Sequence, residues 1–228
     1  MRESGRLLHT WYQGRAKIPA FLDDHVFVAD ALVDLFEATG AVEYLDRAGA
    51  LVGELDRHFH DASGGGYFFA PDDGEVLLTR SKPGTDGSLP SGNGAAAVLL
   101  QRLHALTGDE GLRDRAEDIL RLYHGAAAEN AFGFVSYLEA LELWTDGPTE
   151  IVLVGRSGPD RDALARAAAG VYVPRALVVP ADGSEGWIPA PARGRPMIDG
   201  RATAYVCRGF TCSAPVTSPE DLARLLES

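Results

Sequence analysis

Cysteine, long apolar runs and clustered basic residues are all scarce in this sequence of 228 residues. Its two cysteines, Cys207 and Cys212, are too few for the disulfide framework of a small secreted domain. No stretch approaches the roughly 20 consecutive apolar residues of a membrane span, and the first six residues open no apolar signal-peptide core. We therefore expect a cytoplasmic protein.

The charge balance narrows the expected partners. There are 21 Lys and Arg residues against 33 Asp and Glu residues, which gives a net charge of −12, and no dense basic run occurs. Nucleic acids and anionic membranes are bound through basic patches, so neither is an expected partner. A neutral or cationic small molecule suits this charge better than a phosphate-rich polymer.

Helical periodicity dominates up to about residue 145, and it alternates between two kinds of helix. Residues 21–39 are apolar around most of the helix circumference, which predicts burial on nearly all sides. In the segment after Gly40, the apolar residues share one face, which predicts a helix with one side in water. Residues 91–107 and the segment after Gly108 repeat this pair.

The repeat has a fixed spacing, because Thr39-Gly40 recurs as Thr107-Gly108, 68 residues later. Alternating buried and half-exposed helices are what two concentric rings require, so we predict a mainly α fold, a partial α/α-hairpin toroid over residues 1–147. A third inner helix is expected from Phe132 to Trp144. An Asp73-Gly74 turn between strand-like residues predicts an inserted β-hairpin at about 64–80. A simple helical bundle is the alternative.

Residues 148–228 have a different pattern, which predicts a small C-terminal α/β tail. Strands are expected at 151–154, 176–179 and 204–207, and helices at 159–169 and from 218 to 226. The loop Gly155-Arg156-Ser157-Gly158 follows a strand but matches neither a nucleophile elbow nor a P-loop. Cys207 and Cys212 lack further zinc ligands and the C-x-x-C spacing, so we expect reduced thiols, no metal and no cofactor.

The same spacing of 68 residues aligns Asp23-Asp24-His25 with Ser91-Gly92-Asn93. We expect both polar clusters at the N-terminal ends of inner helices, facing the same side of the ring. Helix capping by Asp23 and Ser91 is the simpler interpretation. The loop before Ser91 adds further polar residues, and a solvated turn is the alternative for them. The candidate site comprises the catalytic candidates Asp24, His25 and Asp86, and the substrate-binding candidates Asp23, Arg80, Lys82, Ser91 and Asn93.

Four segments also carry a family resemblance: LDDHVFVADALVDLFEATG (22–40), GGGYFF (64–69), the polar stretch from Arg80 to Asn93, and AYVCRGFTCSAPVTSPEDL (204–222). Together they resemble the C-terminal region of the DUF255 family of thioredoxin-domain-containing proteins. The resemblance implies a toroid similar to N-acylglucosamine 2-epimerases and six-hairpin glycosidases. On this resemblance, we expect the thioredoxin-like domain of the family to be missing and about two and a half of the implied six hairpins to be present. It has His25 where the family has an aromatic residue.

The resulting hypothesis is a sugar-binding or carbohydrate-active segment. In an epimerase-like reaction, His25 would move a proton next to a carbonyl while Arg80 or Lys82 stabilises the enolate. In a hydrolase-like reaction, Asp24 and Asp86 would divide the acid and base roles. The alternative is a non-catalytic subunit that completes a split toroid with a partner chain.

Uncovered apolar flanks also predict a homo-oligomer or a heteromer, because exposed apolar surface of that size marks association surfaces. The contact is expected around Leu7, Leu8, Trp11 and Tyr12.

Overall fold

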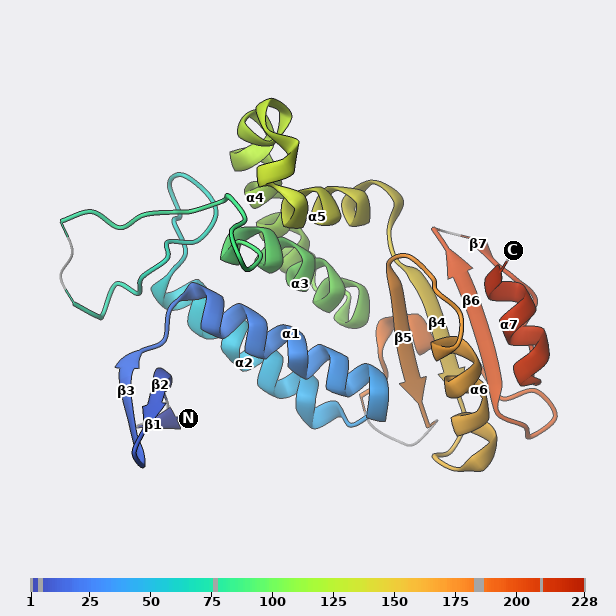
Figure 1. The fold of residues 1–228 in the computed structure, drawn as a ribbon. Coiled ribbons are helices and arrows are strands. Elements are labelled where there is room, and N and C mark those ends of the chain that lie inside the picture. Colours follow the sequence, from blue (N-terminus) through green and yellow to red (C-terminus); the bar gives the residue numbers. More distant parts are fainter. Residues whose placement is uncertain (1, 4–5, 76–77, 183–186, 210, 228) are drawn as a thin grey trace. The chain divides into compact units, whose positions relative to one another are not determined.

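The computed structural model describes residues 2–3, 6–75, 78–182, 187–209 and 211–227 (Figure 1). The chain divides into two compact units. The first comprises Met1–Val33, Glu43–His104 and Asp109–Trp144, and the second comprises Asp34–Val42, Ala105–Gly108 and Thr145–Ser228. The predicted boundary at residues 147–148 lies in the short connection before strand β4.

The first unit begins with a small antiparallel sheet. Strands β1 (Arg2–Glu3), β2 (Arg6–Tyr12) and β3 (Arg15–Pro19) pair in that order. Gln13 and Gly14 connect β2 to β3, with φ angles of 47° and 78°. Positive φ at both residues of a two-residue turn matches the twist of a hairpin, and Gly14 adopts it without steric cost.

The helices that follow this sheet form two antiparallel hairpins and a fifth helix. They are α1 (Leu22–Thr39), α2 (Val42–His58), α3 (Gly92–Thr107), α4 (Glu110–Glu129) and α5 (Val135–Asp146). Most of their residues belong to the first unit, while the last residues of α1, α3 and α5 belong to the second. A 3-10 turn, Ala131–Gly133, precedes α5. Gly40 and Gly108 follow α1 and α3 with φ angles of 77° and 79°, a left-handed conformation that ends a helix. The repeated Thr-Gly pair therefore marks two equivalent helix ends.

Packing in the helical layer follows the apolar periodicity. Val26, Val33 and Phe36 of α1 are fully buried, and so are Leu99 and Leu106 of α3. Helix α2 buries one face, as its amphipathic pattern predicts. The buried residues of that face are Leu45, Ala48, Leu51, Val52, Glu54 and Leu55.

The expected β-hairpin at about 64–80 is a loop in the described residues, and residues 76–77 lie outside them. One isolated bridge joins His60 to Tyr67. Side chains, and not a paired second strand, form hydrogen bonds with the backbone groups of this loop. Arg80 donates to the carbonyls of His58 and Ala70, and Asn93 bonds both backbone groups of Tyr67.

The second unit contains a four-stranded sheet in the order β5-β4-β6-β7. Strand β4 (Thr149–Val154), helix α6 (Pro159–Ala169) and strand β5 (Ala176–Ala181) form a parallel βαβ unit. Strands β6 (Thr203–Arg208) and β7 (Thr211–Cys212) are antiparallel, a short 3-10 turn spans Ala190–Ala192, and α7 (Pro219–Glu227) ends the unit. The core includes Ile151, Leu153, Leu164, Val206 and Leu222. Strands β4, β5 and β6 and helices α6 and α7 lie where the sequence predicts them, whereas β7 and the 3-10 turn were not predicted.

Strand β5 lies at one end of the sheet order. The Val178 N–H donates to the Glu37 carboxylate at 3.0 Å, and Glu37 belongs to the same unit. The Ala176 N–H donates to the Val173 carbonyl at 3.3 Å. Pro180, two residues further on, has no N–H to donate.

Cys207 and Cys212 form a disulfide, so the prediction of reduced thiols is wrong. The two residues are directly opposite each other in the β6–β7 register, with their Cα atoms 4.0 Å apart. A spacing of five residues gave no sign of this pairing in the sequence. The antiparallel register of β6 and β7 is what brings the two side chains together.

The predicted fold class, a mainly α partial toroid, is also wrong. The chain contains a three-stranded and a four-stranded sheet besides its helices, so its fold is α and β. Inner helices of a ring are covered on both flanks, yet α1 leaves Val28 42% and Leu35 43% exposed. Helix α5 likewise leaves Val135 59% and Leu138 38% exposed. No helix among the described residues is both long and apolar enough to cross a lipid bilayer.

Candidate active site

The two predicted polar clusters lie at the N-terminal ends of α1 and α3, which run in the same direction in the first unit (Figure 1). These ends touch: a Cβ atom added to Gly92 would lie 2.2 Å from Oδ1 of Asp23. Further along, Arg102 of α3 forms an ion pair with Asp30 of α1. The placement expected from the 68-residue repeat is therefore observed, because like positions of the two hairpins pack against each other.

Asp23 lies in the first turn of α1 in an unusual environment. Its Oδ1 atom is buried and has no hydrogen-bond partner among the described residues. Burial raises the pKa of this carboxyl, and the negative charge of the neighbouring Asp24 raises it further. Asp23 thus holds a proton more readily than an ordinary aspartate does.

Asp24 pairs with a histidine that the sequence did not indicate. Nδ1 of His9, on strand β2, lies 2.8 Å and 3.0 Å from the two carboxylate oxygens of Asp24. The backbone N–H of Phe21 donates to the same carboxylate at 2.8 Å, which fixes Asp24 at the start of the helix. The His9 side chain is 41% exposed, so its ring reaches solvent. The sequence around His9 contains no local signal for a partner 15 positions away.

His25 does not meet Asp24, although the two are adjacent in sequence. Its ring is 1% exposed, with Nδ1 2.9 Å from the Phe21 carbonyl and Nε2 3.2 Å from Oε2 of Glu54. The ring also packs edge-on against Phe59. Both ring nitrogens are therefore engaged inside the core of the first unit.

Asp86 links the loop before α3 to the start of α5. It accepts hydrogen bonds from the backbone N–H groups of Ser91 and Ser136, each at 2.8 Å, and from the Ser136 hydroxyl at 2.5 Å. Burial would raise the pKa of Asp86, but these bonds outweigh it and lower the pKa below the usual range. Ser91 caps α3, because its Oγ accepts from the Gly94 N–H at 3.0 Å.

Arg80, Lys82 and Asn93 all bond the loop that crosses the helix ends. Nζ of Lys82 lies 2.7 Å from Oδ2 of Asp61 and 3.0 Å from the Gly65 carbonyl oxygen. The Arg80 guanidinium lies over the Phe68 ring at 4.2 Å, besides its two carbonyl partners. Asn93 is fully buried. The structure thus brings these residues to the same end of the helices, with their polar atoms bonded to the protein.

Two aromatic rings lie beside the His9–Asp24 pair. Phe21 and Phe69 stack with ring centroids 4.8 Å apart and planes 9° apart, and both are half-buried. The His9 ring packs edge-on against Phe21 at 5.1 Å. Stacked rings next to polar groups offer a flat surface to the C–H face of a ligand ring.

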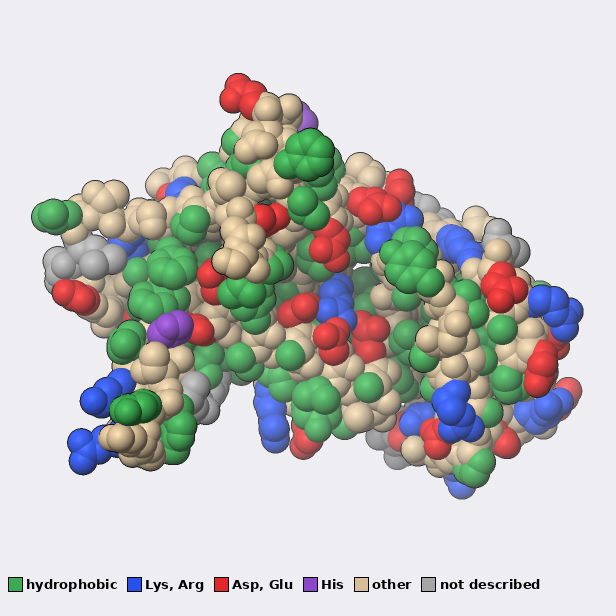
Figure 2. Space-filling model, viewed as in Figure 1, with side chains coloured by type: hydrophobic (Ala, Val, Ile, Leu, Met, Phe, Trp, Pro, Cys, Tyr) green, Lys and Arg blue, Asp and Glu red, His purple; other side chains and the backbone are tan. Residues whose placement is uncertain are grey.

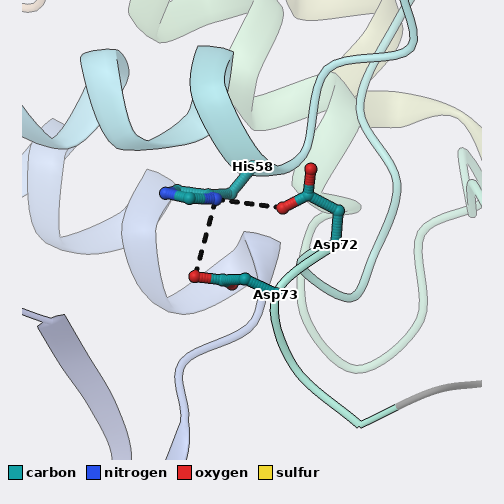
Figure 3. A group of neighbouring side chains, drawn as sticks. All are labelled: His58, Asp72 and Asp73. Carbon is teal, nitrogen blue, oxygen red and sulfur yellow. Dashed lines mark hydrogen bonds and ion pairs between the residues drawn. The ribbon is translucent and has the colours of Figure 1, made fainter.

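A second polar group, also not indicated by the sequence, comprises His58, Asp72 and Asp73 (Figure 3). Nδ1 of His58 lies 3.0 Å from Oδ1 of Asp72 and 3.6 Å from Oδ2 of Asp73, and one ligand atom from each residue lies within 4.8 Å of the others. These atoms are of the type that a divalent cation takes. Arg6 also forms an ion pair with Asp73. Burial would raise the pKa of Asp73, but the bond and charge of Arg6 lower it, so this carboxylate is already matched by a cation.

Comparisons with known proteins give relatives without a described reaction. The chain is 32% identical over 241 aligned residues to spermatogenesis-associated protein 20 of Homo sapiens, and 31% identical to that of Rattus norvegicus. The uncharacterized protein B0495.5 of Caenorhabditis elegans is 29% identical over 217 residues. The alignments cover 98%, 98% and 93% of this chain but about 30% of each relative. No protein-family model matches.

Proposed function

This chain belongs to the DUF255 family of spermatogenesis-associated protein 20, and we propose that its first unit transfers protons on a sugar-like molecule. The observation that carries the proposal is the His9–Asp24 pair, with Nδ1 held at 2.8 Å and 3.0 Å by both carboxylate oxygens. An aspartate that holds one ring nitrogen of a histidine leaves the other nitrogen for proton transfer. This arrangement needs no cofactor.

The proposed chemistry assigns one role to each of three side chains. The Asp24 carboxylate accepts the Nδ1–H of His9, which leaves the Nε2 lone pair to remove a proton from a carbon next to a carbonyl. Asp23, whose pKa is raised, donates its proton to the carbonyl oxygen of the substrate. The product is then a neutral enol, and the substrate oxygen carries no negative charge. A solvent proton delivered to the opposite face of the enol carbon, with the enol proton returned to Asp23, gives the epimer, and His9 releases the abstracted proton to solvent.

Support for a hydroxyl-rich substrate comes from the surroundings of the pair. The stacked Phe21 and Phe69 rings offer an apolar surface for the C–H face of a sugar ring. The net charge of −12 favours a neutral ligand over an anionic one.

The same geometry favours an epimerase-like reaction over a hydrolase-like one. A hydrolase would require Asp86 as the second carboxylate, but Asp86 already accepts bonds from Ser91 and Ser136 that begin two helices. Its lowered pKa keeps it ionised, which suits a helix cap better than a general acid.

The test is proton exchange at carbon. The protein is incubated in D2O with glucose, mannose, fructose or N-acetylglucosamine, and deuterium next to the carbonyl is followed by proton NMR. We expect catalysed exchange with at least one sugar, and a loss of roughly a hundredfold or more in His9→Gln and Asp24→Asn, the usual scale of general acid–base catalysis. His104→Gln is the matched control, because His104 is an exposed histidine bonded to the Asp109 carbonyl. No exchange with any sugar, or full activity in His9→Gln, would refute the proposal.

A second candidate function, binding to a partner chain, is favoured by exposed apolar side chains. Trp11 and Tyr12 at the end of β2 are 61% and 72% exposed, and Phe132 before α5 is 97% exposed. Figure 2 shows hydrophobic side chains open to solvent on the face in view. Light scattering across a dilution series tests this candidate. We expect a mass above 24.3 kDa that falls towards it in a Trp11→Ser, Tyr12→Ser double variant. A constant 24.3 kDa species without a partner contradicts it.

A further inference from the structure

The second unit contains a cavity of about 580 Å³, separate in its residues from the proton-transfer site. It opens where the parallel strands β4 and β5 end, at Val154 and Ala181. Ligands of α/β sheets bind at the carboxyl ends of parallel strands, next to the point where strand order reverses. Here β4 and β5 are the parallel pair, and the cavity lies at their carboxyl ends.

A turn after β4 leads directly into α6 beside the cavity. Ser157 lines the cavity, and Pro159 is the first helical residue. Gly158 stands at the cap position of this 11-residue helix and has no side chain, and no side-chain bond to this position occurs among the described residues. The first N–H groups and the positive end of the helix dipole therefore favour a negative charge at this end.

Arg161 is a second indication, independent of the helix end, that the cavity binds an anion. It lines the cavity, and only 8% of the residue is exposed. Within the described part of the chain, Nη1 of Arg161 donates a hydrogen bond to the Gly155 carbonyl oxygen at 3.3 Å. No carboxylate of the described residues forms an ion pair with Arg161. Buried guanidinium groups are almost always matched by an anion, because an unmatched buried charge is costly.

A second arginine on the cavity wall is also incompletely matched. Nη1 of Arg195 is buried and has no hydrogen-bond partner among the described residues. Nη2 lies 3.9 Å from Oε2 of Glu150, at the limit of an ion pair. Asp182 is an acidic residue on the same wall. Arg195 thus has Glu150 near it, and Arg161 is the arginine of this wall for which the described residues show no carboxylate partner.

The remaining lining is apolar and includes Trp187, Ile188 and Pro180. Trp187 is 44% and Ile188 40% exposed, so these apolar side chains are open to contact with a ligand. A cavity of about 300–1,000 Å³ with an apolar wall and a few charged groups is typical of sites for drug-sized ligands.

We propose that this cavity binds a small organic anion whose carboxylate or phosphate group is held by Arg161 and the N-terminal end of α6. A flat apolar body of the ligand packs against Trp187. Asp160 and Asp162 in the first turn of α6, together with Asp182, disfavour polyanions, so the ligand carries one or two negative charges.

Isothermal titration calorimetry on the full chain tests this with four probes: adenosine monophosphate, indole-3-acetate, inorganic phosphate and uncharged adenosine. We expect at least one of the two anions with a flat body to bind with a dissociation constant below about 1 mM, and adenosine not to bind. Amide shifts in NMR spectra should change at Val154, Ser157 and Ala181. Binding of adenosine as tight as that of its monophosphate, or shifts confined to the first unit, would overturn the proposal, as would no binding of either flat anion.

Variants separate a ligand site from general attraction by positive charge. Arg161→Gln should weaken binding by roughly tenfold or more, because a hydrogen-bonded charge pair is lost. Arg166→Gln is the matched control, since Arg166 is an exposed arginine on the same helix, and it should change affinity less than about twofold. Equal weakening by both variants would refute the site.

Because Arg161 has no carboxylate partner in the described part of the chain, Arg161→Met should leave the free protein at least as thermally stable as before while abolishing binding. A folded Arg161→Met protein that still binds the probe with unchanged affinity overturns the proposal.

Discussion

Asn93→Ala is the substitution whose cost follows most directly from the structure. Asn93 is fully buried at the start of α3, and its side chain makes three hydrogen bonds. Its Oδ1 accepts from the Tyr67 N–H at 2.8 Å, and Nδ2 donates to the carbonyls of Tyr67 and Pro83 at 2.9 Å and 3.1 Å. These bonds attach the loop between α2 and α3 to a helix end.

The expected loss of stability is about 3 kcal/mol, from three bonds worth about 1 kcal/mol each. It is not smaller, because Tyr67 is 1% exposed and its backbone groups would lose a partner without gaining water. Asn93→Asp should cost at least as much, since a carboxylate faces two carbonyls without a proton to donate.

Urea denaturation of both variants, followed by circular dichroism and by tryptophan fluorescence, measures the change in the free energy of unfolding. Two probes are needed because the chain has two units that need not unfold together. Asn130→Ala is the control at the other asparagine, which is exposed, and we expect a change of less than about 1 kcal/mol.

If Asn93→Ala unfolds within about 1 kcal/mol of the parent protein, then Asn93 does not hold the loop. In that case the side chain would be available to a ligand, as the substrate-binding prediction has it, and the reasoning from hydrogen bonds fails.

Three further variants test other parts of the structure. The pKa of Asp86 is lowered in the folded chain, so its ionised carboxylate stabilises the fold above the unfolded pKa of about 3.9, and this stabilisation is lost as the pH falls. The difference in Tm between the parent and Asp86→Asn should therefore shrink from pH 5 to pH 3. A difference that stays constant over this range contradicts the prediction. Gly92→Ala places a Cβ 2.2 Å from a carboxylate oxygen of α1 and should lower the free energy of unfolding by about 1–3 kcal/mol. Gly125→Ala in α4, where a Cβ meets nothing within 4 Å, should raise the free energy of unfolding by about 0.5–1 kcal/mol. Equal Tm values of the two variants would show that the ends of α1 and α3 do not touch. Replacing Cys207 and Cys212 by serine should cost about 2 kcal/mol under oxidising conditions, and alkylation of both thiols without prior reduction would show that the disulfide is absent.

The sequence predicted those parts of the fold that depend on local pattern. The Thr39-Gly40 and Thr107-Gly108 pairs located two helix ends, because a glycine with positive φ is a local requirement. The strands after residue 148 were visible as short runs of β-branched residues. The sheet formed by β1, β2 and β3 was missed, since Arg6–Tyr12 mixes polar and apolar residues without a clean alternation.

The candidate site was less accessible to sequence reasoning, because it depends on side chains brought together from distant positions. Asp24 and His25 were expected to form a pair from their adjacency, but consecutive residues on a helix point about 100° apart. Asp24 therefore reaches His9 on β2, while His25 turns inward to Glu54. No local pattern reports either of these partners.

The outer edge of β5 has a consequence for solubility. An exposed edge strand offers unpaired N–H groups on which a strand of another molecule can add, the first step of edge-to-edge aggregation. On β5, the Ala176 and Val178 donors are already bonded to Val173 and Glu37, and Pro180 has no donor at all. This border of the sheet therefore offers no free N–H group to a further strand, which disfavours cross-β growth from β5.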